Sequence, residues 1–201
     1  MKIGLFGGSF DPPHDGHVRL AGAFYKASGV DLMIVMPSFL APHKAASRTS
    51  AADRLAMTRL AFLPLGEQGV CYTVSDYEIS RDDVSYTFYT VRHLCRAYGV
   101  DRISLCVGSD MLLCFDSWMN AAELLHTCRL YAMAREEGES ALLDQKADDL
   151  RRRYGADVTL LADEPLPVSS TSLREHPSLR GKLLDERVAA YIDRNGLYRQ
   201  S

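Results

Sequence analysis

Apolar runs and amphipathic segments alternate along the whole chain. Six short apolar runs are typical of buried strands, at residues 2–6, 31–36, 70–74, 102–107, 128–134 and 157–161. Apolar positions three and four apart predict a helix after the first run, with Leu20, Ala21, Phe24 and Ala27 on one face and Gly29 at its end. This alternation predicts an α/β fold with a doubly wound, mainly parallel sheet.

Further helices are predicted from their start signals, apolar faces and stop signals. Ser50 and Asp53 resemble a helix start, and an apolar face follows them. Helices are also expected over residues 87–98, which Gly99 ends, and over residues 141–154. A last helix around residues 188–192 is closed by Gly196. The connection at residues 37–50 is polar and is expected to be a loop.

The composition is that of an ordinary soluble protein. The chain has 201 residues, of which 47% are hydrophobic and 24% charged. We predict one domain over residues 1–201, because no repeat, low-complexity segment or linker divides it. The net charge of −3 argues against a nucleic-acid surface. No apolar run approaches the roughly 20 residues of a membrane span, and no signal-peptide pattern precedes the first strand.

The cysteines point to a reducing compartment. All five, Cys71, Cys95, Cys106, Cys114 and Cys128, lie outside any C-x-x-C pair. We therefore expect free thiols that fill the core, and a cytoplasmic protein.

The richest chemistry lies between the first strand and the first helix. Gly7 and Gly8 lack a Cβ and allow the backbone to approach a bulky ligand, and the N–H groups of such a loop can form an anion nest. His14 and His17 are three apart at the expected helix start. That terminus carries partial positive charge and N–H donors. The stretch is therefore a candidate phosphate site.

Other interpretations of this stretch fit less well. No Gly-Lys-Ser/Thr follows the glycines, so it is not a P-loop, and the spacing does not fit the dinucleotide fingerprint G-x-G-x-x-G. A zinc site built on Asp11, His14 and His17 lacks a nearby Cys or third His. Two surface histidines on a structural turn remain an alternative, although several special residue types coincide here.

Three more polar segments are expected at the carboxyl edge of the sheet. Gly108 and Asp110 follow the fourth strand, where Asp110 can accept hydrogen bonds from ribose hydroxyls or cap the next helical turn. Arg135 ends the fifth strand. In the loop after the second strand, His43 and Lys44 are either solvated or brought over bound phosphates.

A second hydroxyl-rich segment lies near residue 170. Ser172-x-x-Glu175 fits a capping box, so a helix start is one interpretation. A helix start with Ser169, Ser170, Thr171 and Arg174 is also a second phosphate cradle.

The two segments together resemble a known family. The run from Gly7 to His17, GGSFDPPHDGH, resembles the first signature of the nucleotidyltransferase superfamily with an H-x-G-H motif, and more closely its bacterial nicotinate-nucleotide adenylyltransferase branch. The family's Ser-Ser-Thr-x-x-Arg is matched at Ser169, Ser170, Thr171 and Arg174. The Ser-Tyr-Thr segment is matched at residues 85–87, with Val84 where the family usually has glycine. The resemblance spans the chain and implies a Rossmann-like fold.

The resemblance also implies roles for residues in this chain. ATP is expected against Gly7, Gly8, Ser9, Phe10, Lys44, Gly108, Asp110, Ser170, Thr171 and Arg174. His14 and His17 are the expected catalytic residues. The mononucleotide is expected against Tyr86, Thr87, Trp118 and Arg135, with the Trp118 ring beside the nicotinate. Without the resemblance, a single Trp is more often part of a core.

The implied reaction transfers AMP from ATP to nicotinate mononucleotide and releases pyrophosphate. The attacking phosphate is already anionic at pH 7, so positioning and charge stabilisation are expected to supply the rate. Mg²⁺ is expected to bridge ATP phosphates largely through water, with no ligand set supplied by the protein. The alternatives are an adenylyltransferase for nicotinamide mononucleotide or phosphopantetheine, or a non-catalytic nucleotide-binding module. A homo-oligomer is compatible with the sequence.

Overall fold

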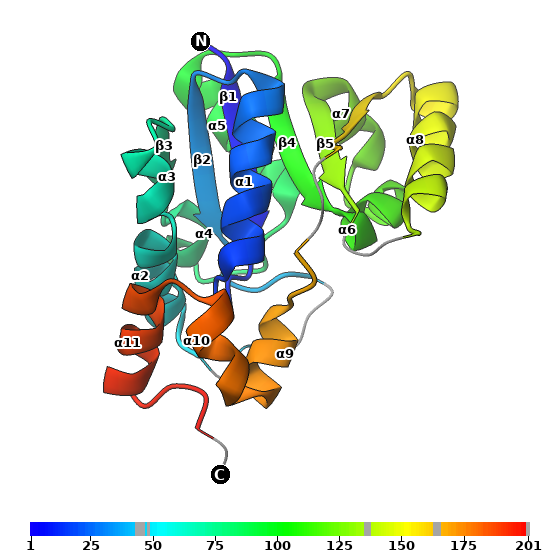
Figure 1. The fold of residues 1–201 in the computed structure, drawn as a ribbon. Coiled ribbons are helices and arrows are strands. Elements are labelled where there is room, and N and C mark those ends of the chain that lie inside the picture. The colour runs from blue at the N-terminus through cyan, green and yellow to red at the C-terminus, as the bar shows by residue number, and fades with distance from the viewer. Residues whose placement is uncertain (43–46, 48, 135–137, 163–165, 200–201) are drawn as a thin grey trace.

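The fold is organised around one parallel sheet (Figure 1). The computed structural model describes residues 1–42, 47, 49–134, 138–162 and 166–199. Its strands are β1 (Ile3–Gly8), β2 (Leu32–Pro37), β3 (Tyr72–Val74), β4 (Ile103–Gly108), β5 (Cys128–Met133) and β6 (Asp157–Leu160). They lie in the order β3-β2-β1-β4-β5-β6, and every pair is parallel. The predicted doubly wound α/β fold is confirmed.

The longer helices lie where the sequence predicts them. They are α1 (Asp15–Ser28), α2 (Ala51–Ala61), α5 (Thr87–Tyr98), α8 (Ser140–Tyr154) and α11 (Glu186–Arg194). Gly29 ends α1 in the left-handed conformation, with a φ of 57°, as its place in the sequence indicates. In the described ranges no helix is long and apolar enough to cross a membrane.

The remaining helices are short and were not expected from periodicity. They are α3 (Leu63–Glu67), α4 (Tyr77–Ser80), α6 (Ser109–Leu113), α7 (Ala121–Thr127), α9 (Ser170–Glu175) and α10 (Arg180–Leu183). The 3₁₀ turns η1 (Phe115–Ser117) and η2 (Pro177–Leu179) complete the set of helical elements.

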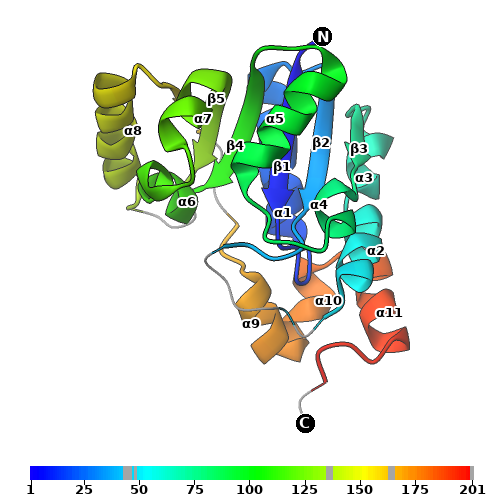
Figure 2. The ribbon, with the colours of Figure 1, turned by 180° about the vertical axis from the view of Figure 1, so that it is seen from behind.

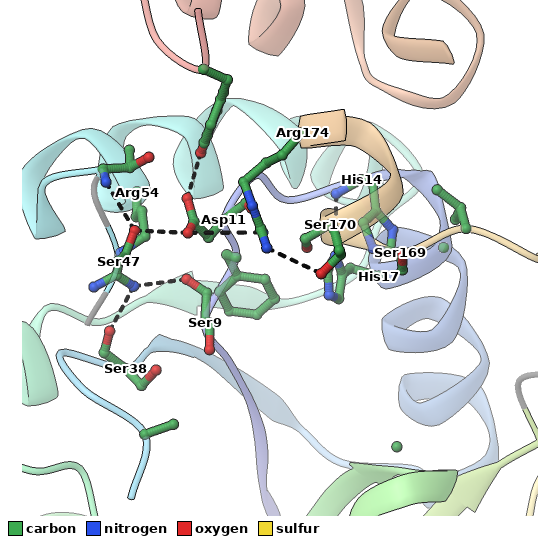
Figure 3. A pocket seen from close by; sticks show the side chains of 18 of the residues that line it. Ser9, Asp11, His14, His17, Ser38, Ser47, Arg54, Ser169, Ser170 and Arg174 are labelled. Carbon is green, nitrogen blue, oxygen red and sulfur yellow. Dashed lines mark hydrogen bonds and ion pairs between the residues drawn. The ribbon is translucent and has the colours of Figure 1, made fainter. Parts of the chain in front are cut away.

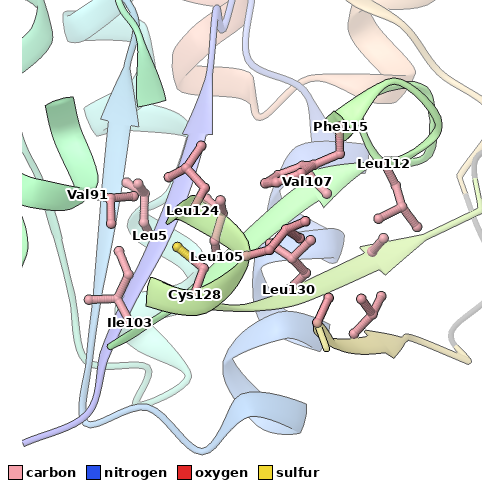
Figure 4. Close-up of a cluster of buried hydrophobic side chains, with 14 of the residues drawn as sticks. Leu5, Val91, Ile103, Leu105, Val107, Leu112, Phe115, Leu124, Cys128 and Leu130 are labelled. Carbon is pink, nitrogen blue, oxygen red and sulfur yellow. The ribbon is translucent and has the colours of Figure 1, made fainter. Parts of the chain in front are cut away.

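The core has two layers, one on each face of the sheet. Successive side chains of β1 point to opposite faces, so Leu5 packs in one layer and Phe6 in the other. The Leu5 face is covered by apolar side chains of α5, α7 and α8. Figure 4 shows Val91 of α5 and Leu124 of α7 in this layer. The Phe6 face is covered by α1, α2 and α11. Both faces of the sheet are therefore buried, which explains why its strands read as continuous apolar runs.

The cysteines occupy different environments, and all five are free thiols. Cys106 and Cys128 are buried in β4 and β5, as predicted for core-filling residues. Cys71 and Cys114 are exposed, so the expectation is wrong for these two. Cys114 lies just before η1, outside the apolar runs, whereas Cys71 belongs to the run at residues 70–74 but lies just before β3, an edge strand of the sheet.

The strand order changes direction between β1 and β4, which are neighbours in the sheet. The connections from β1 lead to one side and those from β4 to the other, so a crevice is expected outside the carboxyl ends of these two strands. The helices α9, α10 and α11 gather at the end of the molecule opposite the N-terminus (Figures 1 and 2). The chain from residue 170 onward thus lies at the edge where the predicted site is expected.

Candidate active site

A cavity of about 990 Å³ opens where β1 and β4 end (Figure 3). Its size is at the upper end of the range for ligand pockets. It is lined by the β1–α1 loop, the segment after β2, the start of α9 and the C-terminal tail. The lining residues used below are Ser9, Phe10, Asp11, His14, Gly16, His17, Ser38, Phe39, Arg54, Gly108, Val168, Ser170, Thr171, Arg174 and Tyr198.

The two predicted catalytic histidines lie together at the start of α1. Their rings stack with centroids 3.7 Å apart and an angle of 27° between planes. The backbone N–H of His14 donates to Nδ1 of His17 at 3.2 Å, and His14 is the N-cap of the helix. Both imidazoles therefore lie where the helix dipole favours an anion.

Gly16, which lies between the two histidines in sequence, allows close packing at the start of α1. A Cβ on this residue would lie 2.8 Å from Cγ1 of Val168 and 3.1 Å from Nδ1 of His14. Val168 immediately precedes the second signature. The absence of a side chain at position 16 thus lets the segment before α9 pack against the helix start and leaves room for the His14 ring.

The buried ring of Phe10 fixes the loop between β1 and α1 to the core. It is 1% exposed and packs against the rings of Phe6 and Phe62, and its edge meets His17 with centroids 5.1 Å apart. Its φ of 48° is in the left-handed region, which is strained for an aromatic residue. The apolar packing of the ring holds this conformation and supports the imidazole above it.

The predicted loop glycines prove to be strand residues. Gly7 and Gly8 continue β1 and pair with Met36 and Pro37 of β2. A Cβ on Gly8 would lie 2.8 Å from the Phe10 ring, so this glycine makes room for that ring. A Cβ on Gly7 would have its nearest atom at 3.9 Å, and Gly7 itself is exposed. The open space at Gly7 is thus compatible with close approach of a ligand to the protein backbone. At Gly8, the sequence did not indicate the packing role.

The second signature is tied to the first. Oγ of Ser170 donates to the Pro12 carbonyl at 2.9 Å, and the Arg174 guanidinium donates to the Asp11 carbonyl at 2.6 Å. Arg174 also donates to Oγ1 of Thr171 at 3.0 Å. The two contacts to the first loop join residues that are 158 and 163 positions apart in sequence. Both candidate phosphate-binding segments therefore face one cavity.

The start of α9 differs from the predicted capping box. Ser169 is the N-cap, its Oγ accepts from the Ser172 backbone N–H at 3.0 Å, and the Ser172 side chain accepts from the Ser169 backbone N–H. The Ser172–Glu175 box is therefore wrong. Because Ser169 lies three residues before Ser172, the same pattern fits one turn earlier, and the earlier pair starts the helix.

The sequence does not mark Tyr198 as part of the site, and it brings in Asp11 only as a ligand in the zinc alternative. The Tyr198 hydroxyl donates to Oδ1 of Asp11 at 2.6 Å, and Ser47 donates to Oδ2 at 2.7 Å. Arg174 lies 3.9 Å from the same carboxyl. Burial, together with the hydrogen bond to Asp11, raises the pKa of Tyr198 far above its usual range, so the phenol remains neutral.

Arg54 was also missed. It projects from α2, is 2% exposed, and donates to the carbonyls of Ser9, Ser38 and Phe39 at 2.7, 2.7 and 2.9 Å. Burial lowers its pKa, and the nearby Asp11 opposes this shift. One buried guanidinium thus fixes the two loops that follow β1 and β2. The signal in the sequence is the place of Arg54 on the apolar face of the helix, because it lies three residues before Met57 and seven residues before Ala61.

The remaining predicted ATP residues are spread around the carboxyl edge. Gly108 lines the cavity as the N-cap of α6. Asp110 is exposed, two residues after that N-cap, and its carboxyl accepts from the Met111 backbone N–H at 3.0 Å. It is therefore not the N-cap itself. His43, Lys44 and Arg135 lie outside the described residues.

Of the predicted mononucleotide residues, the three that the structure describes, Tyr86, Thr87 and Trp118, are not among the lining residues of this cavity. Tyr86 and Thr87 begin α5 and are half-buried, and Trp118 follows η1 and stacks on Phe115 with centroids 4.6 Å apart. The segment before α5 is joined to the cavity wall, since Val84 pairs with Leu40 and the Ser85 N–H donates to the Leu40 carbonyl at 2.8 Å. Val84 is not among the positive-φ residues, so a β-branched residue fits where the family usually has glycine.

Comparison with known proteins agrees with this geometry. The family model described as Cytidylyltransferase-like matches residues 5–176, a range that includes both signatures. The fold and this match are those of a nucleotidyltransferase. A relative from Neisseria gonorrhoeae, named probable nicotinate-nucleotide adenylyltransferase, is 36% identical over 98% of each chain. Another of that name, from Gemmatimonas aurantiaca, is 34% identical over 100% of this chain and 93% of its own length. The chain belongs to the nicotinate-nucleotide adenylyltransferases of the cytidylyltransferase-like family.

A solved structure shares the fold. Nicotinic acid mononucleotide adenylyltransferase of Plasmodium falciparum, complexed with NaAD, superposes with a TM-score of 0.77 and covers 98% of this chain and 97% of its own. The two sequences are 16% identical, so the likeness concerns the fold.

Proposed function

We propose that this protein transfers the AMP moiety of ATP to nicotinate mononucleotide, giving deamido-NAD and pyrophosphate in NAD biosynthesis. The observation that carries the proposal is the joining of the two signatures around one cavity, through Ser170 to Pro12 and Arg174 to Asp11. Relatives that match the chain over nearly its full length carry the name of this activity.

The reacting phosphates are assigned to the start of α1. The mononucleotide phosphate attacks the ATP α-phosphorus in line, and the O–P bond to pyrophosphate breaks, so no catalytic base is required. His17 donates to the transferring phosphoryl group and His14 holds a neighbouring phosphate. Their shared position at the helix N-terminus supports both roles.

The departing pyrophosphate is assigned to the start of α9. Thr171 and Arg174 supply a hydroxyl and a guanidinium, which already contact each other at 3.0 Å and face the cavity. A guanidinium binds phosphate through two parallel N–H groups, so it suits the β- and γ-phosphates. Ser170 completes this cradle beside the first loop.

Mg²⁺ fits this site as an ion carried mainly by ATP. Nowhere in the described ranges do three or more His, Cys, Asp or Glu side chains gather as a metal site. The Asp11 carboxyl in the cavity already accepts from Tyr198 and Ser47. We assign the ion to the ATP phosphates and water, where it would neutralise phosphate charge.

The acceptor is assigned to the start of α5 and to Trp118. Main-chain N–H groups near Tyr86 and Thr87 hold the ring carboxylate, and Trp118 lies against the ring. A carboxylate accepts at both oxygens, whereas an amide turns an NH₂ donor toward these donors. The acid is then preferred by on the order of 1–3 kcal/mol, or about tenfold to more than 100-fold in kcat/KM.

The test is pyrophosphate release from ATP and Mg²⁺ with each acceptor in turn. Nicotinate mononucleotide, nicotinamide mononucleotide and phosphopantetheine are compared at saturating ATP. We expect the highest kcat/KM with the acid. Equal values for the acid and the amide, or a preference for another acceptor, would overturn the substrate and leave adenylyl transfer standing. ATP binding without pyrophosphate release from any acceptor would indicate a non-catalytic nucleotide-binding module.

A further inference from the structure

A buried cation lies in the wall of the cavity. Arg54 of α2 is 2% exposed and donates to the carbonyls of Ser9 and Ser38 (Figure 3), and also to that of Phe39. All three acceptors are neutral. The Nε–H of Arg54 is buried as well, and it has no hydrogen-bond partner among the described residues. Because a buried arginine is normally paired with a carboxylate, this arrangement calls for an explanation.

The charge of Arg54 is not cancelled in its surroundings. None of the carboxyls that the structure describes forms an ion pair with it. The charge of Asp11 influences Arg54, but that carboxyl accepts from two hydroxyls and also lies 3.9 Å from Arg174. Residues 38–49, the segment whose first two carbonyls Arg54 binds, contain no Asp or Glu. Burial lowers the pKa of Arg54, yet a guanidinium remains ionised at pH 7.

The described lining of the cavity carries more positive than negative charge, although the whole chain has a net charge of −3. Its Asp, Glu, Lys and Arg residues are Asp11, Arg54, Arg174 and Arg199. A cleft whose walls carry one sign of charge concentrates the electric field in its interior. Arg199 is exposed and Arg174 half-buried, so salt screens the charge of Arg54 less than theirs.

We infer, on the basis of the proposed function, that Arg54 is a built-in counter-charge for the phosphates of the bound nucleotide. Its N–H groups stay bonded to the backbone while its charge stabilises the phosphates through space. Burying a cation without a carboxylate costs free energy, and a use for the charge explains that cost. Three hydrogen bonds fix the charge before the nucleotide arrives, so it does not have to reorganise on binding. Arg54 thus acts without touching the ligand, unlike Arg174.

A charge that acts through space has a graded effect on nucleotide binding. AMP, ADP and ATP differ by one phosphate at each step, and without Mg²⁺ each phosphate adds negative charge. Loss of the Arg54 charge should therefore weaken ATP most, ADP less and AMP least. Damage to the two loops that Arg54 joins should weaken all three alike, because they share the same nucleoside.

The experiment compares Arg54→Gln, Arg54→Lys and Thr58→Val by calorimetric titration with AMP, ADP and ATP, without Mg²⁺ and without an acceptor. Glutamine and lysine are both shorter than arginine and both donate to carbonyls, so the first two variants differ mainly in charge. Thr58→Val is the control for damage to α2. Oγ1 of the buried Thr58 donates to the backbone carbonyl of Arg54 at 2.7 Å, and its loss leaves the guanidinium in place.

Arg54→Gln is expected to weaken ATP about tenfold more than AMP, with ADP between the two. Arg54→Lys should keep the ratio of the ATP and AMP Kd values within about twofold of the wild-type ratio, although its stability falls. Thr58→Val should lower the free energy of unfolding in urea and leave the ratio unchanged. If Arg54→Gln does not fold, Arg54→Lys still tests the inference, because a lost ratio in a variant that keeps the charge would contradict it.

Equal weakening of the three nucleotides in folded Arg54→Gln would overturn the inference and leave Arg54 a structural tether between two loops. A change in the ratio that is as large in Arg54→Lys as in Arg54→Gln would also overturn it. So would a loss confined to ATP with ADP unaffected, which is the signature of a contact with one phosphate.

Failure of the proposed function has a different signature. The titrations contain no acceptor, so they test Arg54 even if the wild-type protein binds ATP and does not use nicotinate mononucleotide. A wild-type protein that does not bind ATP would overturn both the proposed function and the role of Arg54.

Discussion

The hydroxyl of Tyr198 donates to the carboxyl of Asp11 at 2.6 Å, across a sequence separation of 187 residues. Tyr198 belongs to the C-terminal tail and Asp11 to the loop of the first signature, and both line the cavity. Tyr198 has a φ of 56°, in the left-handed region. The C-terminal tail therefore meets the loop of the first signature at the candidate active site, and the stability of that site depends on contacts made by the last residues described.

Replacing Tyr198 by Phe tests this contact. We expect Tyr198→Phe to lower the free energy of unfolding by about 1–3 kcal/mol, because the half-buried Asp11 carboxyl loses a donor. Tyr191→Phe is the matched control, since Tyr191 also donates to a carboxyl, that of Asp53 at 2.9 Å, outside the cavity. Urea unfolding of both variants gives the comparison. Equal losses in the two proteins would mean that the Tyr198 contact has no special weight.

The same tyrosine predicts a dependence on alkaline pH. Burial and the bond to Asp11 raise the pKa of Tyr198 in the folded protein, while the unfolded chain titrates near the ordinary value of about 10. Its contribution to stability is complete below that value and is lost as the pH rises from there toward the folded-state pKa, by up to about 1.4 kcal/mol per pH unit.

The difference in unfolding free energy between wild-type and Tyr198→Phe is therefore expected to shrink from pH 8 to pH 11. The two proteins differ only at residue 198, so the effects of all other groups cancel in the difference. A difference that stays constant over this range would show that Tyr198 does not titrate differently in the folded and unfolded states.

Substitution of His17 separates catalysis from helix capping. We expect His17→Ala to lower kcat about 100- to 1,000-fold with a much smaller effect on ATP binding, because one preorganised donor to developing charge is lost. His17 also accepts from the His14 backbone N–H. His17→Gln is the control, since glutamine at this position of a helix retains that acceptor and lacks the imidazole.

Steady-state kinetics and calorimetric titration of ATP distinguish the two roles. Both His17 variants are expected to lose kcat to a similar extent. Recovery of kcat in the glutamine variant would reduce His17 to a helix cap, and near wild-type kcat in a folded alanine variant would remove it from the mechanism altogether.

Arg174 is expected to discriminate between ATP and AMP. Arg174→Ala should weaken ATP and pyrophosphate by ~1.5–3 kcal/mol and AMP far less, because AMP has no β- or γ-phosphate for the guanidinium to bind. Arg180→Met is the control. Arg180 donates to the Leu173 carbonyl at 2.9 Å and supports α9 from outside the cavity lining. Arg180→Met should lower stability and leave the ratio of the ATP and AMP affinities unchanged. Equal losses of ATP and AMP affinity in Arg174→Ala would exclude a contact between Arg174 and the β- or γ-phosphate.

The sequence predicts the fold well because each longer element carries its own periodicity. Strands buried on both faces read as apolar runs, and their predicted ends agree with the structure to within two residues. The helices α3, α4, α6, α9 and α10 span four to six residues each, too short for a helical period to be recognised.

The site was only partly predictable for a different reason. The two signatures are contiguous, so their unusual residue types are visible together. Arg54 and Tyr198 act singly, through backbone carbonyls or a carboxyl far away in sequence, and no local pattern marks such partners. Gly8 has a packing role that the sequence did not indicate, because a missing Cβ that admits Phe10 looks the same in sequence as one that admits a ligand.

Gly16 offers a sharp test of how the two signatures pack. We expect Gly16→Ala to cost about 1–3 kcal/mol of stability, because its Cβ would lie 2.8 Å from Val168 and 3.1 Å from the His14 ring. Displacement of His14 should also lower kcat. Gly22→Ala is the matched control on the same helix. Its Cβ would meet Leu65 at 3.4 Å, and alanine is the better helix former by about 0.8–1.0 kcal/mol, so stability should be kept or rise.

A second substitution then identifies the clash. Val168→Ala removes the Cγ1 atom that the new Cβ would meet, so Gly16→Ala/Val168→Ala should recover part of the stability lost in Gly16→Ala. The contact with His14 remains, so kcat should recover less than stability does. Urea unfolding and steady-state kinetics on the single and double variants measure the two effects separately. If Gly16→Ala were as stable and as active as the wild-type protein, the close packing of the segment before α9 against the start of α1 would not be required for the site.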